Sequence, residues 1–197
     1  SDIISRLGLL TTDRPFRLFV LTRALLMCSA LSAPFYVALA QETFGGTPEL
    51  LGSFIIAAGL ASLVSGPVWG KYADRSSKHV MVIAASLTAA IGLLTAFVAI
   101  QYQDHTLLAG FLPIAYFVLS LGHSGVRVGR KTYVVNLGEG NKRTDYVAIS
   151  NSVIGVLLLV VGSVGALAAI VGNAGVVAVL ALMGGAGAIL STRLVST

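Results

Sequence analysis

The chain has 197 residues, of which 56% are hydrophobic and 11% are charged, and its mean hydropathy is +0.89. Because a soluble domain carries about 25% charged residues, this composition excludes an ordinary soluble fold and indicates an integral membrane protein. The net charge of +5 does not imply nucleic acid, since basic residues in a membrane protein chiefly report its orientation. The single cysteine, Cys28, excludes a disulfide within the chain.

Residues 1–13 form a short mixed segment ahead of the first long apolar run. Four apolar residues recur there at helical spacing: Ile3, Ile4, Leu7 and Leu10. Their spacing predicts a small helix lying in the membrane interface, and a frayed leader is the alternative. Asp13 as a cap and Pro15 in the first turn then predict a helix start. Because the sequence starts without methionine and shows no signal-peptide pattern, we expect a piece of a longer or processed protein.

Residues 14–197 contain six apolar runs, each close to the ~20 residues that cross about 30 Å of hydrocarbon. They predict an all-α bundle of transmembrane helices at about 15–40, 49–70, 78–101, 107–131, 145–170 and 175–193. Pro34 is expected to kink the first helix, and residues 132–144 are expected to be the longest connection. Small residues at four-residue spacing predict a close-packing face on the second helix: Ala58, Ser62, Gly66 and Gly70.

The basic residues are distributed unevenly among the connections. All thirteen Lys and Arg fall before or early in the first helix, in the second connection, around the fourth connection, or at the C-terminal end. The other connections carry none of them and contain three of the eight acids: Glu42, Glu49 and Asp104. Because basic connections stay on the cytoplasmic side, we expect both termini in the cytoplasm and the bundle in the cell (inner) membrane.

The stretch between the second and third predicted helices is short and charged, and reads GPVWGKYADRSSK from Gly66 to Lys78. It resembles the signature loop of the major facilitator superfamily of secondary transporters, which reads roughly G-x-L-A-D-R-x-G-R-K. Five residues match this pattern: Gly70, Ala73, Asp74, Arg75 and Lys78. Three residues depart from it: Tyr72, Ser77 and His79. A weakened signature is typical of the second half of these transporters, so the chain resembles a C-terminal six-helix half over residues 14–197.

This resemblance implies three helices followed by three inverted helices, in a secondary active transporter that moves a small solute by alternating access. A second six-helix half, the N-terminal half of the parent or another copy, would complete it. In the family, the signature Asp contacts the opposite half and locks one conformation, which implies a gating role for Asp74. The first and fourth helices line the substrate path, the second and fifth face the other half, and the third and sixth face lipid. The expected partners are the bilayer, that second half and a small-molecule substrate, without cofactor, metal or nucleic acid.

Five polar residues within the spans are candidates for the substrate path: Arg23, Tyr36, Tyr116, His123 and Asn151. An arginine inside a span marks a functional position by default, and snorkelling of Arg23 to the headgroups is the alternative. His123 either lines a water-filled cavity or bonds a neighbouring carbonyl, and Asn151 requires a partner within the bundle. No Asp or Glu lies within the six predicted spans. Three alternatives follow: the proton-coupling residues lie in the other half, transport is not coupled to protons, or His123 is the coupling residue.

Five charged residues around the fourth connection are predicted to anchor the helices at the inner interface: Arg127, Arg130, Lys131, Arg143 and Asp145. Thr144 is expected to cap the fifth helix, where Asp145 interacts favourably with the helix dipole. In the transporter interpretation, this helix start is also where the signature Asp of the other half would dock.

Two other functions remain open at this point. Gly122-His123-Ser124-Gly125 on the fourth helix resembles the nucleophile site of rhomboid intramembrane proteases. That chemistry needs a histidine base near the serine, which rhomboids place on the sixth helix, where this chain has none. His123 itself points about 100° away from Ser124 on a helix, so we expect no enzyme. The nearer alternative is a self-contained six-helix protein, either a homodimeric carrier or a scaffold without transport.

Overall fold

The computed structural model describes residues 8–102, 105–138, 140–161 and 163–196. Every regular element in these ranges is an α-helix. The elements are α2 (Leu9–Thr12), α3 (Arg14–Leu26), α4 (Cys28–Phe44), α5 (Pro48–Ala73), α6 (Ser77–Gln101), α7 (His105–Leu137), α8 (Asn141–Val161) and α9 (Val164–Thr192). Most of the expected interfacial segment, with Ile3, Ile4 and Leu7, lies outside the described residues, as does Asp104.

Five helical segments in the described part of the chain are long and apolar enough to cross a membrane: Arg14–Phe44, Pro48–Ala73, Ser77–Gln101, Thr106–Leu137 and Val164–Thr192. They confirm the predicted all-α membrane fold. The first of them joins α3 and α4 into one crossing. Its start is as expected, because the Asp13 carboxylate accepts a hydrogen bond from the backbone N–H of Phe16 (3.0 Å) and Pro15 lies in the first turn.

The break within the first crossing is at Met27 and not at Pro34, which lies inside α4. Two serine hydroxyls donate to backbone carbonyls on either side of Met27, Ser29 to Leu26 (3.1 Å) and Ser32 to Cys28 (2.8 Å). Such back-bonding competes with the helical ladder and bends it. The helix is therefore interrupted one turn or more before the proline at which the sequence predicts a kink.

The connection between α7 and α8 is much shorter than residues 132–144. Tertiary packing extends α7, because the fully buried ring of Tyr133 stacks on Phe19 with 5.2 Å between the ring centroids. The turn needs a glycine at position 138, where a Cβ would lie 2.7 Å from the Cα of Arg143. The Arg143 Nε then donates to the carbonyl of Val135 (3.1 Å) in the last turn of α7. Thr144 consequently lies inside α8 and is not its cap.

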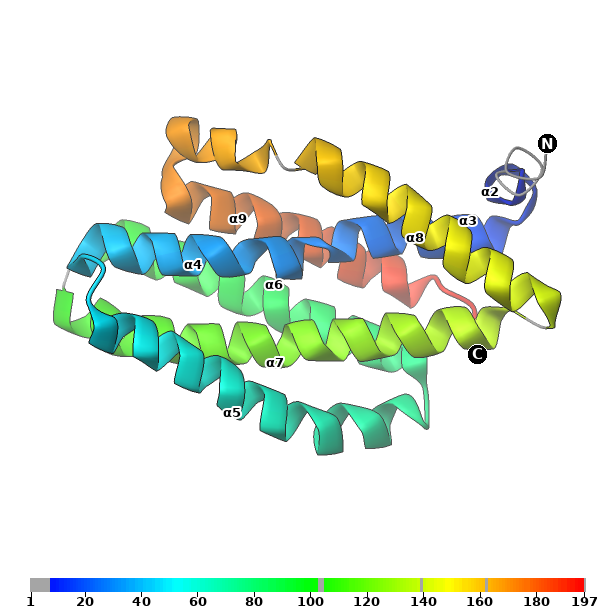
Figure 1. Cartoon of the computed structure of the whole chain (residues 1–197), viewed down its shortest axis with the longest axis horizontal. Coiled ribbons are helices and arrows are strands. Elements are labelled where there is room, and N and C mark those ends of the chain that lie inside the picture. Colours follow the sequence, from blue (N-terminus) through cyan, green and yellow to red (C-terminus); the bar gives the residue numbers. More distant parts are fainter. Residues whose placement is uncertain (1–7, 103–104, 139, 162, 197) are drawn as a thin grey trace.

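The fifth predicted helix is divided between α8 and the beginning of α9. Figure 1 shows α8 and the first part of α9 running in the same direction, after which the chain reverses and the rest of α9 returns. The reversal is at Gly172, whose φ of 71° and ψ of 169° interrupt the helix, within the turn expected at residues 171–174. At the same end of the bundle, the Asn173 side-chain amide donates to Glu42 (2.7 Å) and so ties this turn to the end of α4.

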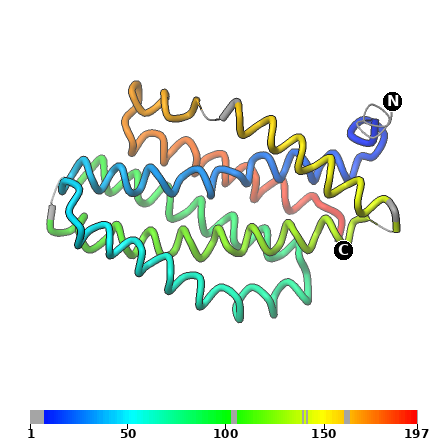
Figure 2. Tube along the Cα trace, in the orientation of Figure 1, coloured from blue at the N-terminus to red at the C-terminus, as the bar shows by residue number. Residues whose placement is uncertain are grey.

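One layer of the molecule contains α5, α7, α8 and the first crossing. In Figure 1, α8 lies along one edge and α5 along the other, α3–α4 and α7 lie between them, and α6 and α9 lie behind. Figure 2 shows the beginning of the described chain at α2 and the end of α9 at the same end of the bundle. This arrangement exposes the α4–α7 seam on the front face, while α6 packs behind it against α7 and α9.

Candidate functional site

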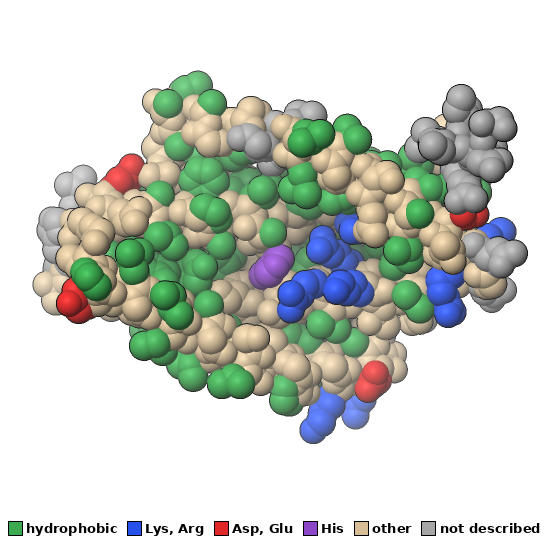
Figure 3. All heavy atoms as spheres, in the orientation of Figure 1, with side chains coloured by type: hydrophobic (Ala, Val, Ile, Leu, Met, Phe, Trp, Pro, Cys, Tyr) green, Lys and Arg blue, Asp and Glu red, His purple; other side chains and the backbone are tan. Residues whose placement is uncertain are grey.

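A cavity of about 220 Å³ opens along the seam between α4 and α7. Ser29 from α4 and Tyr116, Ser120, His123 and Ser124 from α7 supply its polar lining. The Nδ1 of His123 lies 3.1 Å from the hydroxyl of Ser29, so the histidine bonds across the seam. Figure 3 shows a histidine on this hollowed face, directly beside a group of Lys and Arg side chains.

A second cavity, of about 330 Å³, lies between α3, α7 and α8. Arg23, Arg130, Lys131 and Asn151 line it together with three valines. The half-buried Arg23 donates from Nη1 to the hydroxyl of Ser150 (2.6 Å) and from Nη2 to the side-chain oxygen of Asn151 (2.7 Å). Its guanidinium thus has two partners on α8, and the partner that Asn151 is expected to need is an arginine of the first crossing.

The basic residues of α7 continue from the second cavity toward the first. Arg130 is half-buried and close enough to act electrostatically on both Arg23 and His123. Arg127 is exposed and stands ten residues before the end of α7 at Leu137, which is about 15 Å along the helix. His123, Arg127 and Arg130 follow one another at spacings of four and three, so they share one face of α7. The sequence predicts interface anchors on that face, whereas the structure gathers Arg130 and Lys131 around the same cavity as Arg23.

Arg143 and Asp145 lie away from these cavities, in the first two turns of α8. Arg143 holds the turn after α7 through its bond to Val135. Among the two tyrosines predicted for the path, Tyr116 lines the first cavity and packs edge-to-face against Phe54, with ring centroids 4.9 Å apart. Tyr36 is fully buried and its hydroxyl lies near Gly92 of α6, so it packs between helices and does not line either cavity.

The signature stretch forms a short helix connection at the end of the bundle where α2 and the end of α9 lie, here called the basic end. Gly70 lies in the last turns of α5, and three residues from Asp74 to Ser76 lead into α6. The Ser76 hydroxyl caps α6 by accepting from the backbone N–H of His79 (3.3 Å). Asp74 and Arg75 are exposed, and Lys78 is half-buried in the first turn of α6. The serine provides the cap of α6, so the exposed Asp74 is not needed for it.

The small-residue face predicted on the second helix does not pack within the described chain. The side of α5 that packs on α7 instead carries larger residues among small ones: Phe54, Ala57, Ala61, Ser65, Trp69 and Ala73. Ser62 and Gly66 are exposed, and a Cβ added at Gly66 or Gly70 would meet no described heavy atom within 4 Å. The predicted surface has the correct helical spacing, but its partner does not lie among the described residues of this chain.

The glycines of the protease-like motif are explained by packing. A Cβ at Gly125 would lie 2.6 Å from the ring of Trp69, and one at Gly122 would lie 2.6 Å from the side chain of Thr88. The indole N–H of Trp69 donates to the carbonyl of Leu121 (2.8 Å), which locks α5 onto α7 at this point. The histidine bonds Ser29 and not its neighbouring serine, so the motif lacks the arrangement of a nucleophile and its base.

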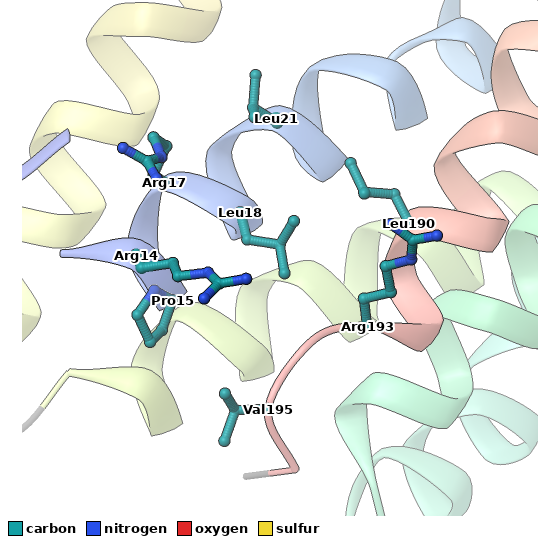
Figure 4. Close-up of a pocket in the computed structure, with 8 residues that line it drawn as sticks. All are labelled: Arg14, Pro15, Arg17, Leu18, Leu21, Leu190, Arg193 and Val195. Carbon is teal, nitrogen blue, oxygen red and sulfur yellow. The ribbon is translucent and has the colours of Figure 1, made fainter. Parts of the chain in front are cut away.

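A third cavity is one that the sequence does not predict. It measures about 470 Å³ and lies at the basic end between the start of α3 and the end of α9. Figure 4 shows Arg14, Arg17 and Leu18 from α3 bordering it together with Arg193 from the end of α9. The spacing of Arg14, Leu18 and Leu21 on one helix face is the only signal in the sequence, because the contribution of α9 depends on the tertiary structure.

Comparison with known proteins agrees with this architecture. The family model described as Major Facilitator Superfamily matches residues 18–196. No curated protein and no solved structure matches the chain significantly. Members of the matched family are membrane carriers and not enzymes, as the sequence predicted. Since the match covers most of the chain, the protein belongs to the major facilitator superfamily of transporters.

Proposed function

We propose that this chain forms one six-helix half of a carrier that moves a small solute by alternating access. The observation that carries this proposal is the polar, hollowed face along α4 and α7, flanked by α5 and α8. A polar cavity open to one side of a membrane bundle needs a second wall to separate it from lipid. A second six-helix half seated on this face would enclose the cavities at the centre of the complete transporter.

The exposed side of α5 supports a helical partner at the edge of this face. Its large apolar residues are strongly exposed, for example Ile55 at 73% and Leu63 at 75%. Gly66 and Gly70 next to them leave the backbone open to close approach by another helix. In the proposed carrier, a helix of the second half packs along this exposed side of α5. The exposed Asp74, which follows the end of α5, contacts the second half and gates transport.

The charge distribution supports an orientation with the signature connection in the cytoplasm. Figure 3 shows the Lys and Arg side chains of this face on the half of the molecule that holds the chain ends, and none at the opposite end. Glu42 lies at that opposite end, separated from Asp74 by the length of α5, 26 residues or about 39 Å. By the positive-inside rule, both ends of the chain are then cytoplasmic.

The proposal is tested by asking whether the seam is reached from both sides of the membrane. In the intact protein, a cysteine placed at Ser124 should react with an impermeant maleimide from the cytoplasmic side in one state and from the outer side in another. A cysteine at Leu182, an exposed position of α9 away from the seam, should remain unlabelled from either side. Labelling at Ser124 from one side under every condition would contradict alternating access.

The homodimer alternative gives a different result in the same membranes. If two copies of this chain formed the carrier, a cysteine at the exposed Leu63 of α5 would lie near Leu63, or near another helix, of the second copy. Cross-linking would then produce a dimer of identical chains. Under the proposal, the same cysteine cross-links to a chemically different six-helix half, or within the same polypeptide when both halves are one chain.

A further inference from the structure

We propose that the cavity between α3, α7 and α8 binds the oxyanion group of a small organic anion, a carboxylate or a phosphate, through Arg23, Arg130 and Lys131. This inference rests on the proposed carrier function and specifies its class of substrate. Arg23 and Arg130 are half-buried within helices that cross the membrane, and none of the described residues lining the cavity is acidic. Several positive charges held close together in a membrane bundle, without a carboxylate in the cavity lining, raise the free energy of the folded protein. A bound anion would lower it.

The hydrogen-bonding capacity of Arg23 points to the same conclusion. Its five N–H groups form a planar fork, and the two bonds to Ser150 and Asn151 use only part of it. Its Nε is buried and has no hydrogen-bond partner among the described residues. The two bonds fix the guanidinium in place, so its remaining donors are already oriented for a planar or tetrahedral oxyanion. Asn151 bonds Arg23 through its oxygen and keeps an amide N–H₂ group for the cavity that it lines.

The size of the site suits a short molecule with a charged end. The cavity of about 330 Å³ is near the lower end of the range for small-ligand sites, roughly 300–1,000 Å³. The shared face of α7 leads from Arg130 to His123 over seven residues, which is about 10 Å. A molecule anchored at Arg130 can therefore extend along the seam toward His123, Ser29 and Tyr116, which line the neighbouring cavity.

Binding is tested with the intact protein, purified in a neutral detergent at constant ionic strength. Succinate and inorganic phosphate serve as carboxylate and phosphate probes, and succinamide is the uncharged counterpart of succinate. We expect at least one of the two anions to raise the Tm, and succinamide to leave it unchanged. Arg23→Gln and Arg130→Gln should each weaken the apparent affinity by about tenfold or more. Lys142→Gln is the matched control, because it removes one exposed charge of α8 that lines neither cavity.

A third variant keeps the test informative if the arginine variants fold poorly. Asn151→Asp places a carboxylate against Arg23 without changing the size of the side chain. It should raise the Tm without any anion and abolish stabilisation by the anions. Equal stabilisation by succinamide, no stabilisation by either anion, or full anion binding in the Asn151→Asp variant would each overturn the inference.

The anion site and the carrier function can be rejected independently of each other. Anion stabilisation with one-sided labelling at Ser124 would support the site and reject alternating access. Two-sided labelling without anion stabilisation would reject the site and leave the carrier function standing.

A second proposal rests on a different cavity, between α3 and α9. We infer that the cavity of about 470 Å³ between α3 and α9 holds an anionic phospholipid of the cytoplasmic leaflet. Arg14 and Arg17 lie in the first turn of α3, and Leu18 and Leu21 lie about one turn deeper. On the other helix, Arg193 follows the last turn of α9 and Leu190 lies deeper. Positive charge therefore lies at the membrane surface and apolar side chains lie below it, in the order of a phosphate headgroup and its acyl chain. Figure 4 shows these side chains around one opening.

This lipid site is tested by native mass spectrometry of the intact protein with phosphatidylglycerol or phosphatidylcholine. The protein should retain phosphatidylglycerol preferentially, and the double variant Arg17→Gln/Arg193→Gln should lose most of that preference. Inorganic phosphate should not compete with the lipid, because the leucines contribute to binding only through an acyl chain. Equal retention of both lipids, an unchanged preference in the double variant, or displacement by phosphate would overturn the inference. The double variant Lys71→Gln/Lys142→Gln serves as the control for total charge, because it also removes two exposed charges and neither of them lines this cavity.

Discussion

Arg23 and Asn151 are joined by a 2.7 Å hydrogen bond that connects the first crossing to α8, across 128 positions of sequence. The bond is charge-assisted and lies next to a second one from the same guanidinium to Ser150. This cluster connects α8 to the first crossing and forms part of the wall of the cationic cavity.

The first prediction follows from that bond. Arg23→Gln and Asn151→Ala should each lower the Tm of the purified protein, and the double variant should lower it by less than the sum. The coupling should correspond to about 1.5–3 kcal/mol, the usual scale for a hydrogen bond to a charged group. Arg23→Gln combined with Lys142→Gln should be additive. Additivity of the Arg23 and Asn151 variants would show that the bond contributes nothing.

A second prediction concerns the contact between α5 and α7. Gly125→Ala introduces a Cβ about 2.6 Å from the ring of Trp69, which the donated bond to Leu121 holds in place. We expect a loss of about 1–3 kcal/mol and a change in indole fluorescence. Gly110→Ala on the same helix meets no described heavy atom within 4 Å and should be neutral or stabilising. Equal Tm values for the two variants would argue against close packing at position 125.

A third prediction addresses gating by the signature connection. Asp74→Asn in the intact protein should lower the rate of solute uptake while expression stays near normal, because the exposed carboxylate lies at the surface of this half and outside its packed core. Glu49→Gln, an exposed acid in the first turn of α5 at the opposite end, should leave uptake unchanged. Unaltered uptake in the Asp74 variant would remove its gating role.

A fourth prediction concerns the basic end of the bundle. The hydroxyl of Tyr146 donates to the carboxylate of Asp13, and its ring stacks on Phe16 with centroids 4.2 Å apart. Tyr146→Phe keeps the stacking and removes the hydrogen bond, so it should lower the Tm by an amount equivalent to about 1 kcal/mol. Tyr146→Ala should cost substantially more, since it also removes the aromatic contact. A phenylalanine variant as unstable as the alanine variant would assign the stability to the hydroxyl alone.

Several features of the fold follow from local sequence patterns. Asp13 and Pro15 have the residue types that begin a helix, and the cap forms as predicted. The turn at Gly172 is predictable because a glycine and an asparagine interrupt an apolar run. The need of Asn151 for a partner follows from its polarity in an apolar span, although the identity of that partner does not.

Other features depend on contacts between distant segments. The predicted end of α7 is too early because Thr132 and the residues after it look like a polar connection, whereas Tyr133 is buried against Phe19 and keeps the helix intact. The polarity of Tyr36 predicts a place on the substrate path, yet the direction of its side chain places it in the core. The glycines at 122 and 125 resemble part of a nucleophile motif, but close packing against Thr88 and Trp69 accounts for them.

Hydropathy and charge alone determined that this protein is a helical membrane bundle, because the cost of placing unpaired backbone groups and charges in lipid restricts the chain to few solutions. Only the tertiary structure decided which polar residues meet. Helical periodicity places a residue on a face of its own helix, but the faces that come together depend on packing between segments more than a hundred residues apart. For that reason, the cavity of Arg23, Arg130 and Lys131 is not visible in the sequence that contains all of its parts.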